Sequence, residues 1–142
     1  MGIAFLAGPR VVLRPREVEE AEFYQAGINR PEIRPFVSLY APVNRAAERE
    51  WLEGAHRQKE VVPFTIALRE GGRPIGGGEL RCGPAPHRTA ELGIALFGEE
   101  FHGRGLGTEA VGLLAAYGFD TLNLHRIELF GENSSVAKHD LR

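Results

Sequence analysis

The chain has a single cysteine, Cys82, in 142 residues, and this scarcity excludes two kinds of structure. One cysteine can form neither an internal disulfide nor a cluster of thiolate metal ligands, so a reducing compartment is expected. Because nothing near Cys82 in the sequence would lower its pKa, we predict a small strand residue there and not a nucleophile. The five histidines lack the paired spacing of a metal site, and no metal is predicted.

Long apolar runs and a strong net charge are also absent. No run reaches the ~20 residues that a membrane-spanning helix needs. The first residues, MGIAFLAGPR, are interrupted too early for a signal peptide. The formal net charge of -2 gives little long-range attraction for nucleic acid or acidic lipid. Neither a nucleic acid nor a membrane is therefore expected as a partner, and a cytoplasmic location is predicted.

What the chain does contain is the composition of an ordinary globular protein. Hydrophobic residues make up 43% of it and charged residues 25%, which argues against a disordered or fibrous chain. No internal repeat or low-complexity linker divides the sequence, and this length suits one hydrophobic core. We expect a single domain over residues 1–142.

The first half alternates strand and helix signals. A strand is predicted at 11–15, where VVLR is stopped by Pro15, and a helix at 17–29, whose apolar residues recur at helical spacing. Asn44 is a suitable N-cap for a second helix. One face of that helix would carry Ala47, Trp51, Leu52 and Ala55.

The second half begins with strand signals. The segments VVPFTIALRE and RPIGGGELR read as two strands joined by a two-residue turn at Gly71 and Gly72, since glycine tolerates the positive φ of such turns. A third strand, TAELGIALFG, follows a proline-rich loop, and its apolar residues alternate. A helix is predicted at 108–122 and a last strand at RIELF, residues 126–130. The class is thus mixed α/β.

The loop HGRGLGT lies between the third of these strands and the helix that follows. Glycines at 103, 105 and 107 allow successive main-chain N–H groups to converge, and a helix N-terminus adds its dipole, so a phosphate is the expected ligand. Arg104 adds a full positive charge. Glycines by themselves are also typical of a tight turn that binds no ligand, and this alternative to a phosphate site stays open.

Two other phosphate motifs fit the loop less well. A P-loop needs Gly-Lys before Ser or Thr, and Leu106-Gly107-Thr108 lacks the lysine. A dinucleotide-binding turn needs GxGxxG, whereas GRGLGT offers GxGxG. Glu128 is in a plausible place for that fold's acidic residue, so the dinucleotide reading is weakened but stays open.

The segment ELGIALFGEEFHGRGLGTEAVGLLAAYGFDTLNLHRIEL resembles the acetyl-CoA core of GNAT N-acetyltransferases, especially the branch of ribosomal-protein N-terminal-amine acetyltransferases. The opening VVLRPREVEEAEFYQAGINRPEIRPFV is similar to the start of that branch, so the likeness extends to Asn133. The family's loop pattern is Gln or Arg, two residues, Gly, one residue, then Gly or Ala. It maps onto His102, Gly103, Arg104, Gly105, Leu106 and Gly107, with His102 a departure that leaves main-chain binding unaffected.

This resemblance implies a mostly antiparallel twisted sheet flanked by helices, with acetyl-CoA as cosubstrate and no metal. An amine, either a protein N-terminal α-amine or a small amine, would attack the thioester directly. The diphosphate would lie on the loop from His102 to Thr108, and the pantetheine along Ala95, Leu96 and Phe97. Asn133 matches an asparagine near the pantetheine or the acceptor, and a turn cap is its alternative role.

Glu91 matches the position where some GNAT members place a glutamate base. A base is useful because amines arrive mostly protonated, with a pKa of about 8 for an α-amine and about 10.4 for lysine. The alternative is that Glu91 orders the strand end or orients the substrate. For His125, a structural role is predicted.

The end of the chain departs from the family pattern. Members usually continue past such an asparagine with a helix that carries a tyrosine and with two further strands, whereas here the tyrosine position is Asp140 and the sequence ends at Arg142. The ending HDLR is similar to part of a late family strand, so we expect C-terminal strands to be missing, with the intervening family residues either deleted or not represented in this sequence. The strand at 126–130 would then have an unpaired edge, which predicts a homodimer.

The acceptor itself cannot be read from the residues. The segment 29–44 is expected to set specificity, with Phe36 and Tyr40 offering apolar contact. A second hypothesis is a module that binds coenzyme A without turnover because its C-terminal part is incomplete. A nucleotide-binding protein is a third and weaker reading.

Overall fold

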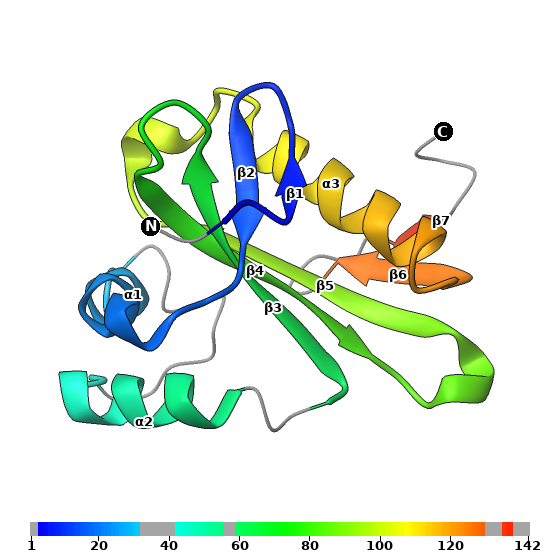
Figure 1. Ribbon diagram of the computed structural model, residues 1–142, viewed down its shortest axis with the longest axis horizontal. Helices are drawn as coiled ribbons and strands as arrows, with labels where there is room; N and C mark the ends of the chain where they lie inside the picture. Colours follow the sequence, from blue (N-terminus) through cyan, green and yellow to red (C-terminus); the bar gives the residue numbers. More distant parts are fainter. Residues whose placement is uncertain (1–2, 32–41, 56–58, 130–134, 138–142) are drawn as a thin grey trace.

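The computed structural model describes residues 3–31, 42–55, 59–129 and 135–137. These residues form one seven-stranded sheet whose spatial order follows the chain (Figure 1). Neighbouring strands are antiparallel, except that β5 and β6 are parallel. The strands are β1 Leu6–Ala7, β2 Val11–Arg14, β3 Val61–Leu68, β4 Pro74–Cys82, β5 Thr89–Leu96, β6 Arg126–Leu129 and β7 Ser135–Ala137. The mixed α/β class with a mostly antiparallel sheet is therefore confirmed.

Three α-helices flank this sheet in the part of the chain described: α1 (Ala21–Ile28), α2 (Arg45–Ala55) and α3 (Leu106–Asp120). Figure 1 shows α1 and α2 together at lower left and α3 at upper right. Helix α3 makes the crossover between the parallel strands β5 and β6, as a parallel connection requires. Among the helices within the described ranges, none has the length and apolar character needed to cross a bilayer.

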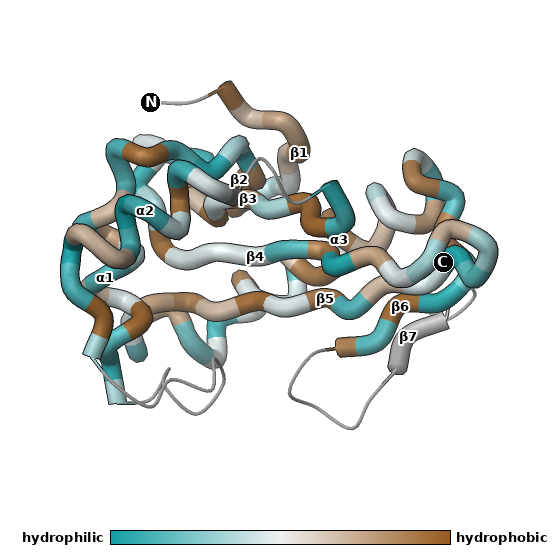
Figure 2. Tube along the Cα trace, turned by 90° about the horizontal axis from the view of Figure 1, so that it is seen from below, coloured by the Kyte–Doolittle hydropathy of each residue, from teal (hydrophilic) through white to brown (hydrophobic). Residues whose placement is uncertain are grey.

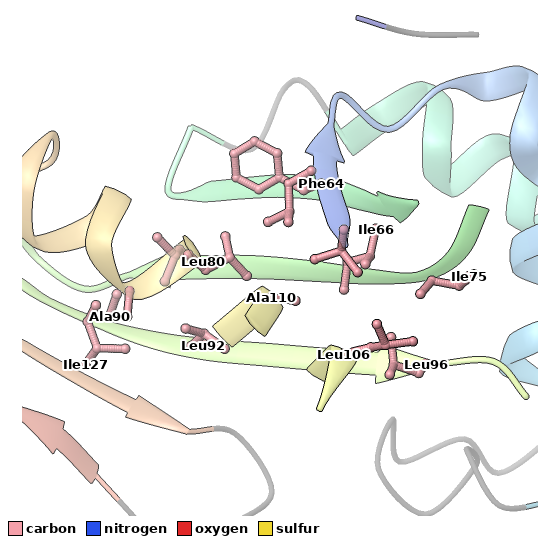
Figure 3. Packing of buried hydrophobic residues seen from close by; sticks show 14 of the residues in the cluster. Phe64, Ile66, Ile75, Leu80, Ala90, Leu92, Leu96, Leu106, Ala110 and Ile127 are labelled. Carbon is pink, nitrogen blue, oxygen red and sulfur yellow. The ribbon is translucent and has the colours of Figure 1, made fainter. Parts of the chain in front are cut away.

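The larger hydrophobic core lies between the sheet and α3. Leu80 and Leu92 face each other across β4 and β5 (Figure 3). Leu114 of α3 is fully buried in the same cluster. From the spacing of its apolar residues, the sequence predicts a buried helix face of Ala110, Leu113, Leu114 and Tyr117; Ala110 and Leu114 are buried as predicted, whereas Leu113 and Tyr117 are half-buried. A smaller cluster lies on the other face of the sheet and consists of Ala21, Tyr24, Leu52 and Phe97.

Strand alternation assigns each side chain of β4 and β5 to one of these two faces. Leu80 and Leu92 face α3, so the residues next to them along each strand face α1 and α2. Glu79 is paired with Gly93, and Arg81 with Glu91, on that second face. The sheet therefore separates an apolar layer under α3 from a more polar layer under α1 and α2.

The β3–β4 hairpin differs from its prediction in the length of the turn. Gly71 and Gly72 have positive φ, at 85° and 72°, as the sequence indicates. The turn is nevertheless longer than two residues, because the Leu68 N–H donates to the Arg73 carbonyl and the two strands close around four residues. The prediction was therefore right about the backbone conformation of the glycines and wrong about the strand ends.

The amphipathic face predicted for α2 is right for Leu52, which is buried, and wrong for Ala47 and Trp51. Its N-cap is confirmed, since the Asn44 side-chain oxygen accepts the N–H of Ala47 at 2.8 Å. The buried residues are Glu48 and Leu52, while Ala47 and Trp51 are exposed; the side chain of Ala55 lies outside the described residues. The helix is rotated so that Leu52 meets α1 and Trp51 faces a cleft.

The predicted open edge at RIELF is also wrong. Strand β6 pairs with β5 on one side and with β7 on the other, where Ile127 lies opposite Val136. No strand is predicted at 135–137, because three residues with one β-branched side chain are too short a pattern. The homodimer prediction depended on that open edge and is therefore no longer supported by it. Phe130 and the HDLR ending lie outside the described residues.

Candidate active site

The glycine-rich loop lies where sequence reasoning expected it, between β5 and α3. A short 3-10 turn, Glu99–Phe101, follows β5, and α3 begins at Leu106. Gly103 and Gly105 have φ of 71° and 78°, a region that side chains with a Cβ rarely adopt. Residues 102–105 are exposed to solvent. The glycines are thus needed for the turn that brings the chain into the helix.

The main-chain amides of this loop are available to a ligand. Within the described ranges, no N–H from Gly103 to Thr108 donates a hydrogen bond, and the first such bond is from Glu109 N–H to the Gly105 carbonyl. The first amides of a helix have no intrahelical acceptor, and the helix dipole makes them attractive to anions. The loop therefore presents a set of free donors suited to a phosphate or diphosphate.

A pair of charged residues ties this loop to the start of β2. The Glu109 carboxylate accepts the N–H groups of Arg10 and Val11 at 2.8 and 2.7 Å and the Arg10 Nε–H at 3.0 Å. The same guanidinium donates from Nη1 to the Arg104 carbonyl at 2.6 Å. In a trans peptide the carbonyl and the following N–H point in opposite directions, so this bond turns the Gly105 N–H away from Arg10. Arg10 and Glu109 together fix the peptide that a phosphate would meet.

These donors lower the pKa of the Glu109 carboxyl. Burial alone raises the pKa of its carboxyl, but the hydrogen bonds from Arg10 and Val11, with the charge of Arg10, outweigh burial and lower the pKa. The carboxylate is thus charged at neutral pH, and Arg10 balances its charge. Without Arg10, an uncompensated anion would lie on the first turn of α3 and repel a phosphate.

The end of β5 is partly engaged by the protein itself. Strand β6 pairs with β5 only from Thr89 to Leu92, so the following residues of β5 have no strand beside them on that edge in the described part of the chain. The His102 Nε2–H donates to the Leu96 carbonyl at 3.0 Å, and the Phe97 N–H donates to Ile75. His102 thus braces the strand end with its side chain.

A cleft of about 510 Å³ opens on the face of the sheet under α1 and α2. Glycines form part of its floor: a Cβ on Gly77 would lie 2.9 Å from the Tyr24 ring. Figure 2 shows the pale, glycine-rich part of β4 running beside β5. The volume is within the range of small-molecule sites.

Glu91 is exposed and lines this cleft from β5. It lies opposite Arg81 on β4 and next to Glu128 on β6 in strand register. A second carboxylate, Glu79, faces the same cleft from β4, with Arg81 at 3.2 Å and Arg16 at 3.9 Å. Two carboxylates therefore line the cleft from the sheet, and Glu79 is the one engaged by two arginines.

Arg16 forms the inner wall of the cleft. Its guanidinium lies over the rings of Tyr24 and Trp51, at 5.0 and 5.3 Å from their centroids. Nη2 donates to the carbonyls of Phe64 and Gly78. Burial raises the pKa of the neighbouring Tyr24 hydroxyl, so Tyr24 is neutral at physiological pH. Arg16 thus holds α1, α2 and the sheet together.

The structure brings together most of the predicted residues, but in two groups. His102 to Thr108 form the amide-lined loop, and Glu91 with Ala95 and Phe97 line the cleft on β5. Asn133, Phe36 and Tyr40 lie outside the described residues. Cys82 ends β4 as a half-buried residue, and burial raises the pKa of its thiol, which suits the predicted structural role.

Sequence reasoning missed Arg16, Glu48 and Glu79. Alternation along β4 could have placed Glu79 on the face of Glu91, because Glu79 flanks the buried Leu80. Arg16 and Glu48 gave no local signal, because their positions depend on how α1 and α2 pack. Within the described ranges, no group of three or more His, Cys, Asp or Glu side chains is placed to hold a metal ion.

Comparison with known proteins assigns the family. Residues 10–134 match the acetyltransferase (GNAT) domain family. The chain belongs to the GNAT family. The GNAT resemblance of the sequence is thereby confirmed, and the protein is an acyltransferase that uses acetyl-CoA. The dinucleotide-binding interpretation is wrong, because residues 10–134 match the GNAT family and because the sheet is antiparallel apart from the β5–β6 pair, unlike the mostly parallel sheet of that fold.

Similar GNAT proteins include an uncharacterised N-acetyltransferase, p20, of Bacillus licheniformis. It is 29% identical over 122 residues, which cover 84% of this chain and 68% of the relative. A spermidine N-acetyltransferase from Vibrio cholerae, solved with coenzyme A and spermine, matches with a TM-score of 0.74 at 24% identity, covering 86% of this chain and 71% of that one.

A putative ribosomal-protein-serine acetyltransferase, also from Vibrio cholerae, has a TM-score of 0.73 at 20% identity, covering 90% of this chain and 75% of that one. The fold is therefore shared with members of the ribosomal-protein branch that the sequence resembles. At these identities the two structures show the fold alone.

Proposed function

We propose that this GNAT chain moves the acetyl group of acetyl-CoA to a primary amine, of a small molecule or a protein N-terminus, by direct attack on the thioester. One observation carries the proposal: β5 ends in the amide-lined loop and also carries Glu91 into the 510 Å³ cleft. A donor held by the loop and an acceptor in the cleft would therefore meet along one strand.

The loop residues His102, Gly103, Arg104, Gly105, Leu106, Gly107 and Thr108 would hold the diphosphate. Their free amides and the α3 dipole favour it, and Arg104, whose Nη1 donates to the Glu100 carbonyl, keeps its charge at the loop. The main chain at Ala95, Leu96 and Phe97, on the open edge at the end of β5, would pair with the pantetheine amides. Two main-chain groups there are already bonded within the protein: the Leu96 carbonyl to His102 and the Phe97 N–H to Ile75. A contribution from Asn133 stays a prediction.

Glu91 would accept the proton that the acceptor ammonium must lose. The freed amine nitrogen then forms a bond to the thioester carbonyl carbon, the carbon–sulfur bond breaks, and coenzyme A leaves as a thiolate, which takes up the second proton that the nitrogen loses as it becomes an amide. A thiol pKa of about 8.5 makes this a fair leaving group at neutral pH without an enzyme acid. A positioned base is typically worth about 10²–10⁴-fold in rate.

The test is a titration with acetyl-CoA followed by an assay for free thiol with pooled primary amines. Acetyl-CoA is expected to bind in a one-to-one complex, and thiol is expected to appear only when an amine is present. Binding without thiol release for any amine would favour a coenzyme A-binding module instead. The cytoplasmic location and the homodimer stay predictions.

A further inference from the structure

Glu48 is a buried carboxylate in the cleft that lacks a hydrogen-bond partner for one oxygen. It lies in the first turn of α2, is 3% exposed, and lines the cleft. Its Oε1 has no hydrogen-bond partner within the described residues. Buried polar atoms in folded proteins are almost always paired, so an unpaired carboxylate oxygen on a cavity wall points to a missing donor.

Arg16 cannot supply that donor fully. Its charge lowers the pKa of Glu48 against the larger effect of burial, which raises it. Its Nη2 is committed to two main-chain carbonyls, however, its Nη1 lies 3.9 Å from Glu79, and its buried Nε–H donates to no acceptor within the described residues, Glu48 included. Arg16 therefore lies near both Glu48 and Glu79, and it donates no hydrogen bond to the Glu48 Oε1 within the described residues.

The charge of the cleft as a whole is acidic. Glu48, Glu79 and Glu91 line it, against Arg16 and Arg81. Arg81 contacts Glu79 at 3.2 Å, so both arginines are directed towards the same carboxylate. Glu48 on α2 and Glu91 on β5 remain as two acidic groups on different walls of one cavity.

The surface beside Glu48 suits an aliphatic cation. Trp51 lies three residues along α2, lines the cleft and is 42% exposed, which is high for a tryptophan. An indole face attracts ammonium groups and also covers methylene chains, and the Arg16 guanidinium already lies over this ring, so the methylene chain of the amine would pack on the exposed part of the indole. Ile94 and Phe97 add apolar lining from the sheet.

We propose that the acceptor is a small aliphatic amine with a second protonated amine, which binds at Glu48 against Trp51 while the reacting amine reaches Glu91. The inference rests on the proposed function and adds the substrate class to it. It selects small diamines over monoamines of equal length.

Matched amine pairs test this directly. We would measure kcat/KM for 1,4-diaminobutane, 1,5-diaminopentane and 1,6-diaminohexane against butylamine, pentylamine and hexylamine. At least one diamine is expected to exceed its monoamine by about 10-fold or more, the effect of a charge-assisted hydrogen bond at a buried site. Glu48→Gln is expected to bring this ratio close to one.

Glu53→Gln is the matched control, because Glu53 is an exposed glutamate of the same helix, paired with Arg49; it is expected to keep the wild-type ratio. If Glu48→Gln fails to fold, Trp51→Leu replaces it and should lower the ratio several-fold. Equal kcat/KM for diamines and monoamines in the wild type would overturn the inference and leave the proposed function standing. Absence of thiol release with every amine would overturn both.

Discussion

At the scale of single residues, the environment of each glutamate decides what its carboxylate can do. Glu91 is exposed on the cleft wall, Glu79 forms ion pairs with two arginines, and the Glu109 carboxylate accepts hydrogen bonds from three N–H donors. Of these, Glu91 is best placed to exchange a proton with an incoming amine. The role proposed for it therefore follows from its being the carboxylate with the fewest commitments.

Glu91→Gln is expected to lower kcat by about 10²–10⁴-fold, because the amide cannot accept the ammonium proton. Thermal stabilisation by acetyl-CoA should be unchanged, since the loop is untouched. The measurement is steady-state kinetics combined with thermal shift. Glu128→Gln, the neighbour of Glu91 on β6, serves as the control and should retain turnover. A wild-type kcat in Glu91→Gln would transfer the role to Glu79.

Glu109 makes a pH-dependent contribution to stability. Its folded-state pKa is lowered, so the carboxylate stabilises the fold at pH values above its unfolded pKa of about 4.3, and this contribution is lost as the pH falls through the lower folded value. Urea unfolding should show Glu109→Gln less stable than wild type by about 1–3 kcal/mol at pH 7. The difference should shrink steadily below about pH 4. A difference that is constant from pH 7 to pH 3 would contradict the assignment.

At the scale of elements, the phosphate loop is held in place by a contact between the start of β2 and α3, two elements that lie far apart in the sequence. Arg10 binds both Glu109 in α3 and the Arg104 carbonyl in the loop. Removing it would free the Arg104–Gly105 peptide to rotate and would leave Glu109 uncompensated near the bound phosphates. The contact thus acts on donor binding and not on the acceptor cleft.

Arg10→Ala is expected to raise KM for acetyl-CoA by about 10-fold, the cost of one charge-assisted contact, with little change in KM for the amine. The penalty should disappear with S-acetylpantetheine, which lacks the diphosphate. Arg69→Ala is the control, because Arg69 bonds the Gly8 carbonyl at the same β1–β2 turn without touching the loop. An equal penalty with both donors would show that Arg10 acts through general stability.

Local sequence patterns predicted the loop, β5 and α3 well, because their glycines and apolar spacing are decided within a few residues. The patterns failed where tertiary packing decides. The face of α2 is set by Leu52 meeting α1 and by Glu48 lying near Arg16, neither of which the helix period alone can show. Strand β7 was missed because pairing with β6, and not propensity, makes Ser135–Ala137 a strand.

At the scale of the whole molecule, the sheet divides the two substrates between its faces. The face under α3 is filled by the large hydrophobic core, which holds α3 and hence the loop in place. The opposite face is opened by Gly77 and Gly93 into the acidic cleft under α1 and α2. Strand β5 connects the two, so the account depends on a donor bound at the end of that strand.

Thermal stabilisation by acetyl-CoA, compared for wild type and Gly105→Val, tests this most directly. A valine at position 105 would have to adopt a φ of +78°, and its Cβ would lie 3.0 Å from the Arg10 guanidinium. Gly71→Val imposes similar strain, at φ +85°, in the open β3–β4 turn and is the matched control. At 100 times its dissociation constant, acetyl-CoA should stabilise wild type and Gly71→Val by about 2.7 kcal/mol, and Gly105→Val by far less. Full stabilisation of a folded Gly105→Val protein would contradict the account.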